Sequence, residues 1–291
     1  MTTNPTALTG APPGTDHATL PEPGRPRSAN GSPRRASSPK RPLRALRLLR
    51  RWVSPVAIIV IWEILSRTGV LSERTMAAPS TIFAGAVELA RDGVLGSATL
   101  ASVQRVAVGF AIGACIGLVL AVIAGLNRVG EDAIDPPMQM LRTLPHFGLI
   151  PLFIIWMGIG EAPKLALIAM GVCFPLYLNT LAGIRGVDRK AIEAARSMNL
   201  TWSQRLRHVV IPGALPQTLV GLRQSLGIAW LSLIVAETVS ASNGLGYMIN
   251  RAREFGQTDV IVVGLAVYSL LGLATDGIVR YLEGRALAWR V

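Results

Sequence analysis

Cysteine and charge are both scarce in this chain. Its two cysteines, Cys115 and Cys173, each lie inside an apolar stretch, so the sequence offers neither a disulfide framework nor a cysteine-based metal motif. Charged residues make up 16% of the 291 residues, whereas soluble domains carry about a quarter. No group of residues has the spacing of metal ligands or of a nucleophile with its base. A soluble fold is therefore excluded, and neither a metal nor a cofactor is expected.

Hydrophobic residues, 51% of the total, gather in stretches about as long as a membrane-crossing helix. About 20 residues at roughly 1.5 Å per residue cover the apolar core of a bilayer, which is about 30 Å thick. The short alternating segments of a membrane β-barrel are absent. We therefore predict an all-α, polytopic membrane protein with about six transmembrane helices, near residues 53–71, 103–126, 138–158, 163–184, 217–240 and 258–282.

The first 42 residues are rich in Pro, Ser, Gly and Arg and have few large apolar side chains. Such a segment buries too little surface to offset the entropy of ordering, so residues 1–42 are predicted to form a disordered basic tail. The basic residues adjoin the first span, which favours attraction to lipid over binding of nucleic acid. No cleavable signal peptide is apparent. With the tail cytoplasmic, most of the 29 Lys and Arg residues lie inside, so we predict a multi-pass membrane protein with both termini in the cytoplasm.

One polar segment, residues 185–208, separates the fourth and fifth predicted spans. Residues 188–198 favour a helix, and Asn199 follows where a helix ends in the left-handed conformation, which Asn tolerates better than most residues. Thr201 and Gln204 have the spacing of a capping box, which predicts a second short helix over residues 201–210. Pro212 and Pro216 flank the entry to the fifth span. This helix–turn–helix is typical of a docking site for another protein rather than of a simple channel.

The segment resembles the cytoplasmic loop of ABC importer permeases, whose pattern is Glu-Ala-Ala, three residues, Gly, nine residues, Ile, one residue and Leu-Pro. The matching positions hold Glu193, Ala194, Ala195, Asn199 in place of Gly, Val209 in place of Ile, and Ile211-Pro212. The resemblance implies that residues 185–212 form a coupling loop, which inserts into a groove on a cytoplasmic ABC ATPase. Asn199 departs from the family pattern but preserves the turn chemistry.

Nearly the whole membrane portion, from about Trp62 to Trp289, resembles permeases for aliphatic sulfonates, and less closely those for taurine, nitrate and pyrimidine precursors. The matching segments include residues 105–110, 139–146, 149–152, 156–161, 174–175, 230–237 and 252–259. The resemblance implies a type I ABC importer transmembrane domain over residues 97–281. It implies a permease homodimer in a bacterial plasma membrane, with separate ATPase subunits and an external substrate-binding protein. The chain has no GxxxxGKS or GxxxxGKT phosphate loop, so we do not expect it to be an enzyme.

Two other classes of membrane protein are possible. A secondary transporter driven by an ion gradient would show internal inverted repeats with broken helices in matching positions, and no convincing repeat is apparent. A non-transporting membrane anchor would leave the patterned cytoplasmic loop unexplained. The favoured function is import of a small anion, with an aliphatic sulfonate ahead of taurine, nitrate or a pyrimidine precursor.

Ionisable residues inside spans are costly in lipid and are candidate functional groups. By position they are Glu63, Arg105, Arg223, Glu237 and Asp276. Glu63 and Arg67 are four residues apart and can pair on one helix face. Arg105 and Arg223 lie near span ends, from which a long basic side chain can reach the interface.

Glu237 is predicted near the outer end of the fifth span. Together with Arg251 and Arg253 it is a candidate for an outer gate or for a dock for the binding protein. The alternative is a structural ion pair. The sequence leaves the two interpretations open.

Arg142, Thr143 and His146 lie on both sides of Pro145 in the third predicted span. A prolyl kink frees backbone carbonyls that can line a cavity, and a cationic side chain beside it suits an anionic substrate. These three residues are therefore a candidate for the translocation pathway.

Gly109, Gly113 and Gly117 recur every four residues in the second predicted span. Small residues at this spacing share one helix face and allow a second backbone to approach closely. The partner is either another helix of the same chain or a second subunit.

Overall fold

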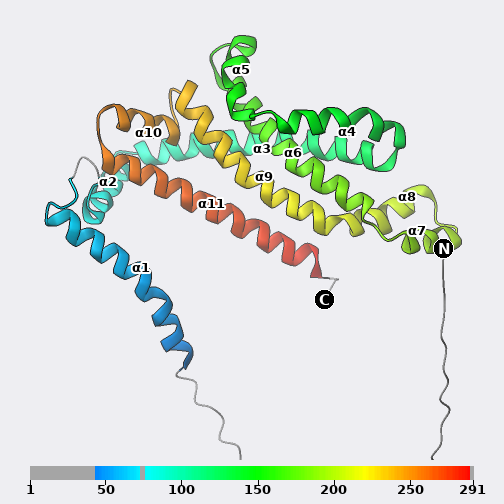
Figure 1. The fold of residues 1–291 in the computed structure, drawn as a ribbon, viewed down its shortest axis with the longest axis horizontal. Helices are drawn as coiled ribbons and strands as arrows, with labels where there is room; N and C mark the ends of the chain where they lie inside the picture. Colours follow the sequence, from blue (N-terminus) through cyan, green and yellow to red (C-terminus); the bar gives the residue numbers. More distant parts are fainter. Residues whose placement is uncertain (1–42, 73–75, 289–291) are drawn as a thin grey trace, which may run out of the picture. The chain divides into compact units, whose positions relative to one another are not determined.

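The computed structural model describes residues 43–72 and 76–288, so the predicted tail lies outside the described residues. Within these ranges every regular element is a helix, which confirms the predicted all-α class. The elements are α1 Leu43–Arg67, α2 Pro79–Arg91, α3 Val94–Leu126, α4 Arg128–Thr143, η1 His146–Leu149, α5 Ile150–Met157, α6 Glu161–Arg185, α7 Arg189–Ser197, α8 Trp202–Arg205, η2 Leu206–Val210, α9 Ile211–Ser240, α10 Leu245–Glu254 and α11 Thr258–Ala286 (Figure 1). The chain divides into units Met1–Arg50 and Arg51–Val291, and the elements that position the site belong to the second.

Four helices of the described ranges are long and apolar enough to cross a membrane: α3, α6, the continuous helix Trp202–Ser240 and α11. The pair α4 and η1–α5, whose halves meet at 88°, adds a fifth if it counts as one span. These five correspond to the second to sixth predicted spans. Helix α3 begins at Val94, earlier than predicted, because its first turns contain small residues that fold as helix without standing out as apolar.

The first predicted span, residues 53–71, falls on α1, which is not among the helices that pass as spans. Its uninterrupted apolar stretch is short, because Arg51 precedes it and Glu63 and Arg67 follow. The side chains from Val53 to Ile61 are exposed. The assignment of α1 to the membrane therefore stays a prediction.

The third predicted span is broken at Pro145, as its sequence indicates. Leu144 has extended backbone angles, φ −72° and ψ 138°, which is the conformation that a following proline favours. The second proline of this span, Pro151, does not interrupt a helix. It lies at the start of α5, where the missing N–H costs no helical hydrogen bond.

The core is formed where α6 packs against α3 on one side and α9 on the other. The glycines of α3 face α6 within the same chain: a methyl group on Gly117 would lie 2.7 Å from the Cys173 carbonyl oxygen, and one on Gly113 would collide with the Ala169 backbone. Glycine is required at both positions because any side chain would separate the two helices. Cys173 is buried in this contact, whereas Cys115 is exposed, so only one cysteine is a core residue.

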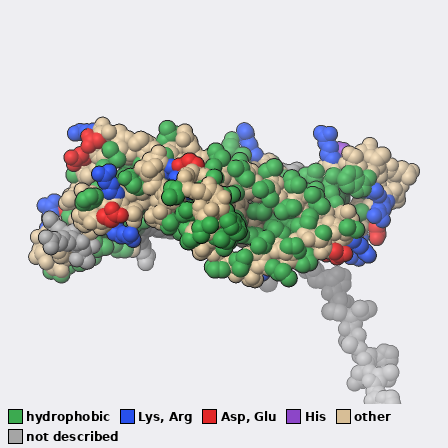
Figure 2. Space-filling view, turned by 90° about the horizontal axis from the view of Figure 1, so that it is seen from above, with side chains coloured by type: hydrophobic (Ala, Val, Ile, Leu, Met, Phe, Trp, Pro, Cys, Tyr) green, Lys and Arg blue, Asp and Glu red, His purple; other side chains and the backbone are tan. Residues whose placement is uncertain are grey.

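The surface of the molecule is apolar over a broad middle region. Figure 2 shows hydrophobic side chains there, with most of the visible charged side chains gathered toward the two ends. The exposed face of α3 contributes a row of aliphatic side chains, namely Val108, Ile112, Ile116, Val119 and Ile123. Large contiguous apolar surfaces on soluble monomers are rare, and this one is expected for a protein whose solvent is lipid.

Candidate functional site

The predicted coupling loop, residues 185–212, is an ordered structure of two helical segments. Helix α7 follows directly after the end of α6, and the side chain of Asp188 caps it by accepting a hydrogen bond of 2.9 Å from the Lys190 backbone N–H. Asn199 has φ 55°, the left-handed conformation predicted for it. Since Asn tolerates this conformation, the turn forms without the glycine of the family pattern.

The capping box predicted at Thr201 is present. The Thr201 hydroxyl accepts from the Gln204 backbone N–H at 3.4 Å, and the Gln204 side chain accepts from the Thr201 N–H at 2.9 Å. The second segment is not the separate short helix that was predicted, because it continues into α9 as one helix, Trp202–Ser240. Pro212 is accommodated by a π-helical turn, η2, in which the Ile211 N–H donates to the Leu206 carbonyl. A π turn accommodates one extra residue within a helix, because its hydrogen bonds join residues five apart instead of four.

The loop presents charged and apolar side chains outward together. Glu193 and Ala194 are exposed, whereas Ala195 is buried and anchors α7. Met198 and Trp202 are 76% and 60% exposed although both are large and apolar. An exposed Trp and Met on a polar protrusion are typical of a surface that a partner protein covers.

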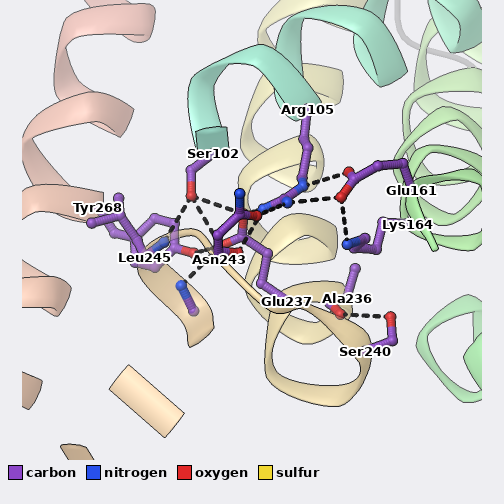
Figure 3. Close-up of polar contacts among 11 residues, drawn as sticks. Ser102, Arg105, Glu161, Lys164, Ala236, Glu237, Ser240, Asn243, Leu245 and Tyr268 are labelled. Atoms are coloured by element: carbon purple, nitrogen blue, oxygen red, sulfur yellow. Dashed lines mark hydrogen bonds and ion pairs between the residues drawn. The ribbon is translucent and has the colours of Figure 1, made fainter. Parts of the chain in front are cut away.

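A network of charged residues lies at the opposite ends of α6 and α9 from this loop. Arg105 of α3 is at its centre, between the carboxylates of Glu161 at the start of α6 and Glu237 near the end of α9 (Figure 3). Its Nη1 lies 2.6 Å from Glu237 Oε1, while Nε and Nη2 lie 2.7 and 2.9 Å from the two oxygens of Glu161. Lys164 Nζ lies 2.8 Å from Glu161 Oε1. Two cations thus face two carboxylates.

Neutral donors complete the coordination of Glu237. The hydroxyl groups of Ser102 and Tyr268 each lie 2.8 Å from one of its oxygens, and the Gly246 N–H donates to it at 2.8 Å. Arg105 also donates to the carbonyl and side-chain oxygens of Asn243. The side chain of Glu237 is fully buried, so these donors replace the water that it has lost. The network joins α3, α6, α9, α10 and α11.

The structure corrects two expectations about these charges. Arg105 does not extend to the interface but is buried, and it is Arg105, not Arg251 or Arg253, that pairs with Glu237. The guanidinium of Arg251 lies 6.0 Å from the ring of Phe255, and Arg253 donates to an amide on its own helix. The structural ion pair, the alternative left open by the sequence, is what the geometry shows at Glu237.

Of the other ionisable residues in predicted spans, Arg223 pairs with Asp276 at 2.7 Å, and Glu63 pairs with Arg67 at 2.5 Å as the spacing indicates. All four side chains are partly or largely exposed. Arg223 and Asp276 connect α9 to α11. The Arg223–Asp276 pair also lines a cavity of about 330 Å³ between these two helices.

The candidate pathway residues around Pro145 are not gathered at one point. Arg142 is exposed, and the Thr143 hydroxyl donates to the Met140 carbonyl at 2.7 Å. His146 instead packs inward: its Nε2 is buried without a hydrogen-bond partner among the described residues, as is the hydroxyl of Ser232 on α9. A methyl group placed on Gly171 of α6 would lie 3.4 Å from His146 Nε2 and 2.7 Å from the Ser232 hydroxyl. His146 Nε2 and the Ser232 hydroxyl therefore both lie beside Gly171, whereas Arg142 and Glu237 are not part of this group.

Sequence reasoning missed several members of the network. Glu161 and Lys164 are three residues apart at the beginning of a span, which is a signal for a charged pair at a helix start. Ser102, Asn243 and Tyr268 carry no comparable signal, because hydroxyl and amide side chains are common at span ends. Among the described residues, no group of His, Cys, Asp and Glu side chains is placed to hold a metal ion.

Comparison with known proteins places these features in a family. The family described as binding-protein-dependent transport system inner membrane component matches residues 113–287, more than half of the chain. The protein named as aliphatic sulfonates transport permease SsuC of Bacillus subtilis is 45% identical over 236 residues, which are 81% of this chain and 86% of that protein. Its namesake in Escherichia coli is 45% identical over 82% of this chain and 90% of that protein. The taurine transport system permease TauC of Escherichia coli is 30% identical over 80% of this chain and 86% of that protein.

Solved structures share the fold. A chain of an amino acid ABC transporter superimposes with a TM-score of 0.58 at 18% identity, covering 68% of this chain and 97% of that one. A chain of the methionine ABC transporter MetNI gives a TM-score of 0.51 at 22% identity, covering 62% of this chain and 92% of that one. This chain belongs to the binding-protein-dependent transport system inner membrane components, the multi-pass permease subunits of ABC importers.

Proposed function

We propose that this permease serves an ATP-driven importer of aliphatic sulfonates. The observation that carries the proposal is the sequence identity of this chain to two permeases named for these substrates. That identity is 45%, compared with 30% to the taurine permease. The importer takes up a small organic anion, and the permease supplies the passage through the membrane. Taurine, nitrate and pyrimidine precursors are the alternative substrates.

Residues 185–212 are the contact with the ATPase in this proposal. Glu193, Ala194 and Ala195 lie on α7, Asn199 makes the turn, and Val209, Ile211 and Pro212 lead into α9. Because the second segment of the loop and α9 are one helix, a displacement of the loop moves the start of a membrane helix directly. The loop therefore has the rigidity that transmission of ATPase closure requires.

The complete importer contains two copies of this chain, two ATPase subunits and an external substrate-binding protein. Both termini and the coupling loop face the cytoplasm, and the start of α6 faces the binding protein. Residues 97–281 form the transmembrane domain of each copy, and residues 53–71 add a peripheral span. ATP-driven closure of the ATPases brings the two loops together and opens the passage outward.

His146 and Arg142 are proposed to line the passage. His146 lies at the break between α4 and α5, where it meets α6 and α9. No described residue bonds its Nε2, which can donate to or accept from a passing group. Arg142 and Thr143, at the end of α4, provide a cation and a hydroxyl at the same break.

Uptake of labelled ethanesulfonate in cells tests the proposal. Deletion of the gene should abolish uptake, wild type should restore it, and Glu193→Arg should not, because the reversed charge disrupts the contact with the ATPase. Asp132→Arg, a charge reversal of an exposed residue on α4, is the matched control and should restore uptake. Excess unlabelled taurine and nitrate should compete weakly. If a strain without other sulfonate importers keeps its ethanesulfonate uptake after deletion, the substrate assignment is wrong.

A further inference from the structure

The two carboxylates around Arg105 differ in their access to solvent. The Glu237 side chain is fully buried, whereas the Glu161 side chain is 55% exposed. The two cations, Arg105 and Lys164, are 6% and 2% exposed. One carboxylate is therefore built into the core, and the other reaches the same cations from the surface.

Glu237 has enough partners to stay in place without Glu161. Ser102, Tyr268, the Gly246 N–H and Nη1 of Arg105 all contact it. The other edge of the guanidinium, formed by Nε and Nη2, meets Glu161 in a two-point contact. That edge, together with Lys164 Nζ, holds the two oxygen atoms of the Glu161 carboxylate. Donors arranged in this way also suit the oxygen atoms of a sulfonate.

Glu161 is in a position to leave. It is the first residue of α6 and follows a short segment in which Gly158 has φ 78°. A methyl group on Gly158 or Gly160 would meet no atom within 4 Å, and Ile159 between them is 86% exposed. The chain before Glu161 is therefore not held by packing, and its carboxylate can turn into solvent while α6 stays in place.

A cavity of about 270 Å³ adjoins this edge of Arg105. Gln104, Asn243 and Glu161 supply its polar wall, and Ala101, Val108 and Leu165 supply an apolar one. The polar wall suits a head group that needs cations and hydrogen-bond donors, and the apolar wall suits a short alkyl chain joined to it. Small-ligand sites combine an apolar lining with a few polar groups in the same way.

We propose that Arg105 and Lys164 form an anion site for the sulfonate head group of the incoming substrate, and that Glu161 occupies this site when substrate is absent. The substrate class rests on the proposed function. The exchange conserves charge, because a sulfonate with one negative charge replaces a carboxylate with one negative charge, so no buried cation is left unpaired. The alkyl chain of the substrate lies along Ala101, Val108 and Leu165.

Direct binding of ethanesulfonate to the purified full-length permease in nanodiscs tests the site by calorimetry. Glu161→Gln removes the competing charge and keeps the shape, so we expect the Kd to fall about tenfold, the scale of one charge-assisted contact. The double variant Glu161→Gln with Lys164→Met keeps the network neutral and should lose this gain, with a Kd above that of wild type. Glu131→Gln is the control, since Glu131 is an exposed carboxylate in a 2.8 Å pair with Arg185 far from the network.

The outcomes separate this proposal from the proposed function. If Glu161→Gln and Glu131→Gln bind ethanesulfonate as wild type does, while the importer takes up ethanesulfonate, the anion site is wrong and the function stands. If Glu161→Gln binds sulfate or nitrate more tightly than ethanesulfonate and cells show no sulfonate uptake, the site stands and the substrate is another anion. If the single variant fails to fold, the charge-balanced double variant decides alone: binding equal to wild type overturns the proposal.

Discussion

Arg105 and Glu237 show how ionised residues are kept inside this molecule. Each would be costly to bury alone, and each instead meets an opposite charge and neutral hydrogen-bonding groups. Glu161 and Lys164 make the set electrically balanced. The stability of this network therefore depends on all of its members. Removal of one member leaves the remaining buried charges without compensation, which is destabilising.

Glu237→Gln should be strongly destabilising, because it leaves Arg105 and Lys164 with one carboxylate between them. We expect a loss of about 3–5 kcal/mol in the free energy of unfolding, the usual effect of breaking a buried pair. Tyr268→Phe removes one hydrogen bond to the same carboxylate and should cost about 1–2 kcal/mol. Thermal unfolding of the purified variants in detergent measures both. Equal melting temperatures for Glu237→Gln and wild type would mean that the network contributes nothing to stability.

At the scale of elements, α3, α6 and α9 owe their packing to small residues. Gly113 and Gly117 bring α3 against the α6 backbone, and a methyl group on Gly221 of α9 would lie 3.1 Å from the Pro175 carbonyl oxygen. Lipid offers no hydrophobic drive for helix association, so close approach and dispersion have to supply it. Gaps or bulges between these helices should therefore cost stability.

Gly113→Ala tests this contact, because the added methyl group would collide with the Ala169 backbone. Overpacking of this kind costs about 1–3 kcal/mol, which thermal unfolding in detergent detects. Gly96→Ala on the same helix is the matched control, since a methyl group there meets no atom within 4 Å. It should raise stability by about 0.5–1 kcal/mol through helix propensity alone. If both variants shift the melting temperature in the same direction, α3 and α6 are not packed as described.

How much of this is predictable from sequence depends on the range of the interactions. The Asn199 turn and the Thr201 capping box involve neighbours in sequence, and both were predicted correctly. The contact of Arg105 with Glu237 joins residues far apart in the chain, and no local pattern identifies which cation meets which carboxylate. The joining of the loop to α9 also escaped prediction, because a proline normally signals a break and here a π turn absorbs it.

At the scale of the whole molecule, two features lie at opposite ends of the same helices. The coupling loop follows the last residue of α6, and the charged network begins at its first residue, 25 residues and about 38 Å away. Helix α9 makes the same connection in reverse, from Ile211 in the loop to Glu237. The proposed ATPase contact and the proposed anion site therefore lie at opposite ends of two helices that pack on each other.

Exposed tryptophans mark the two ends and allow them to be tested separately. Trp202 lies in the coupling loop and is 60% exposed, while Trp156 lies near the start of α6 and is 67% exposed. Trp202→Ala should weaken association with the ATPase subunit by about 30-fold or more, because a central Trp in an interface contributes about 2 kcal/mol or more. Trp156→Ala should leave that affinity unchanged, and neither variant should lower the melting temperature of the permease alone, since neither side chain is packed in its core. Titration of purified ATPase subunit onto permease in nanodiscs measures the affinities. Equal weakening by both variants would place the ATPase contact elsewhere, because two residues separated by the length of α6 cannot share one docking groove.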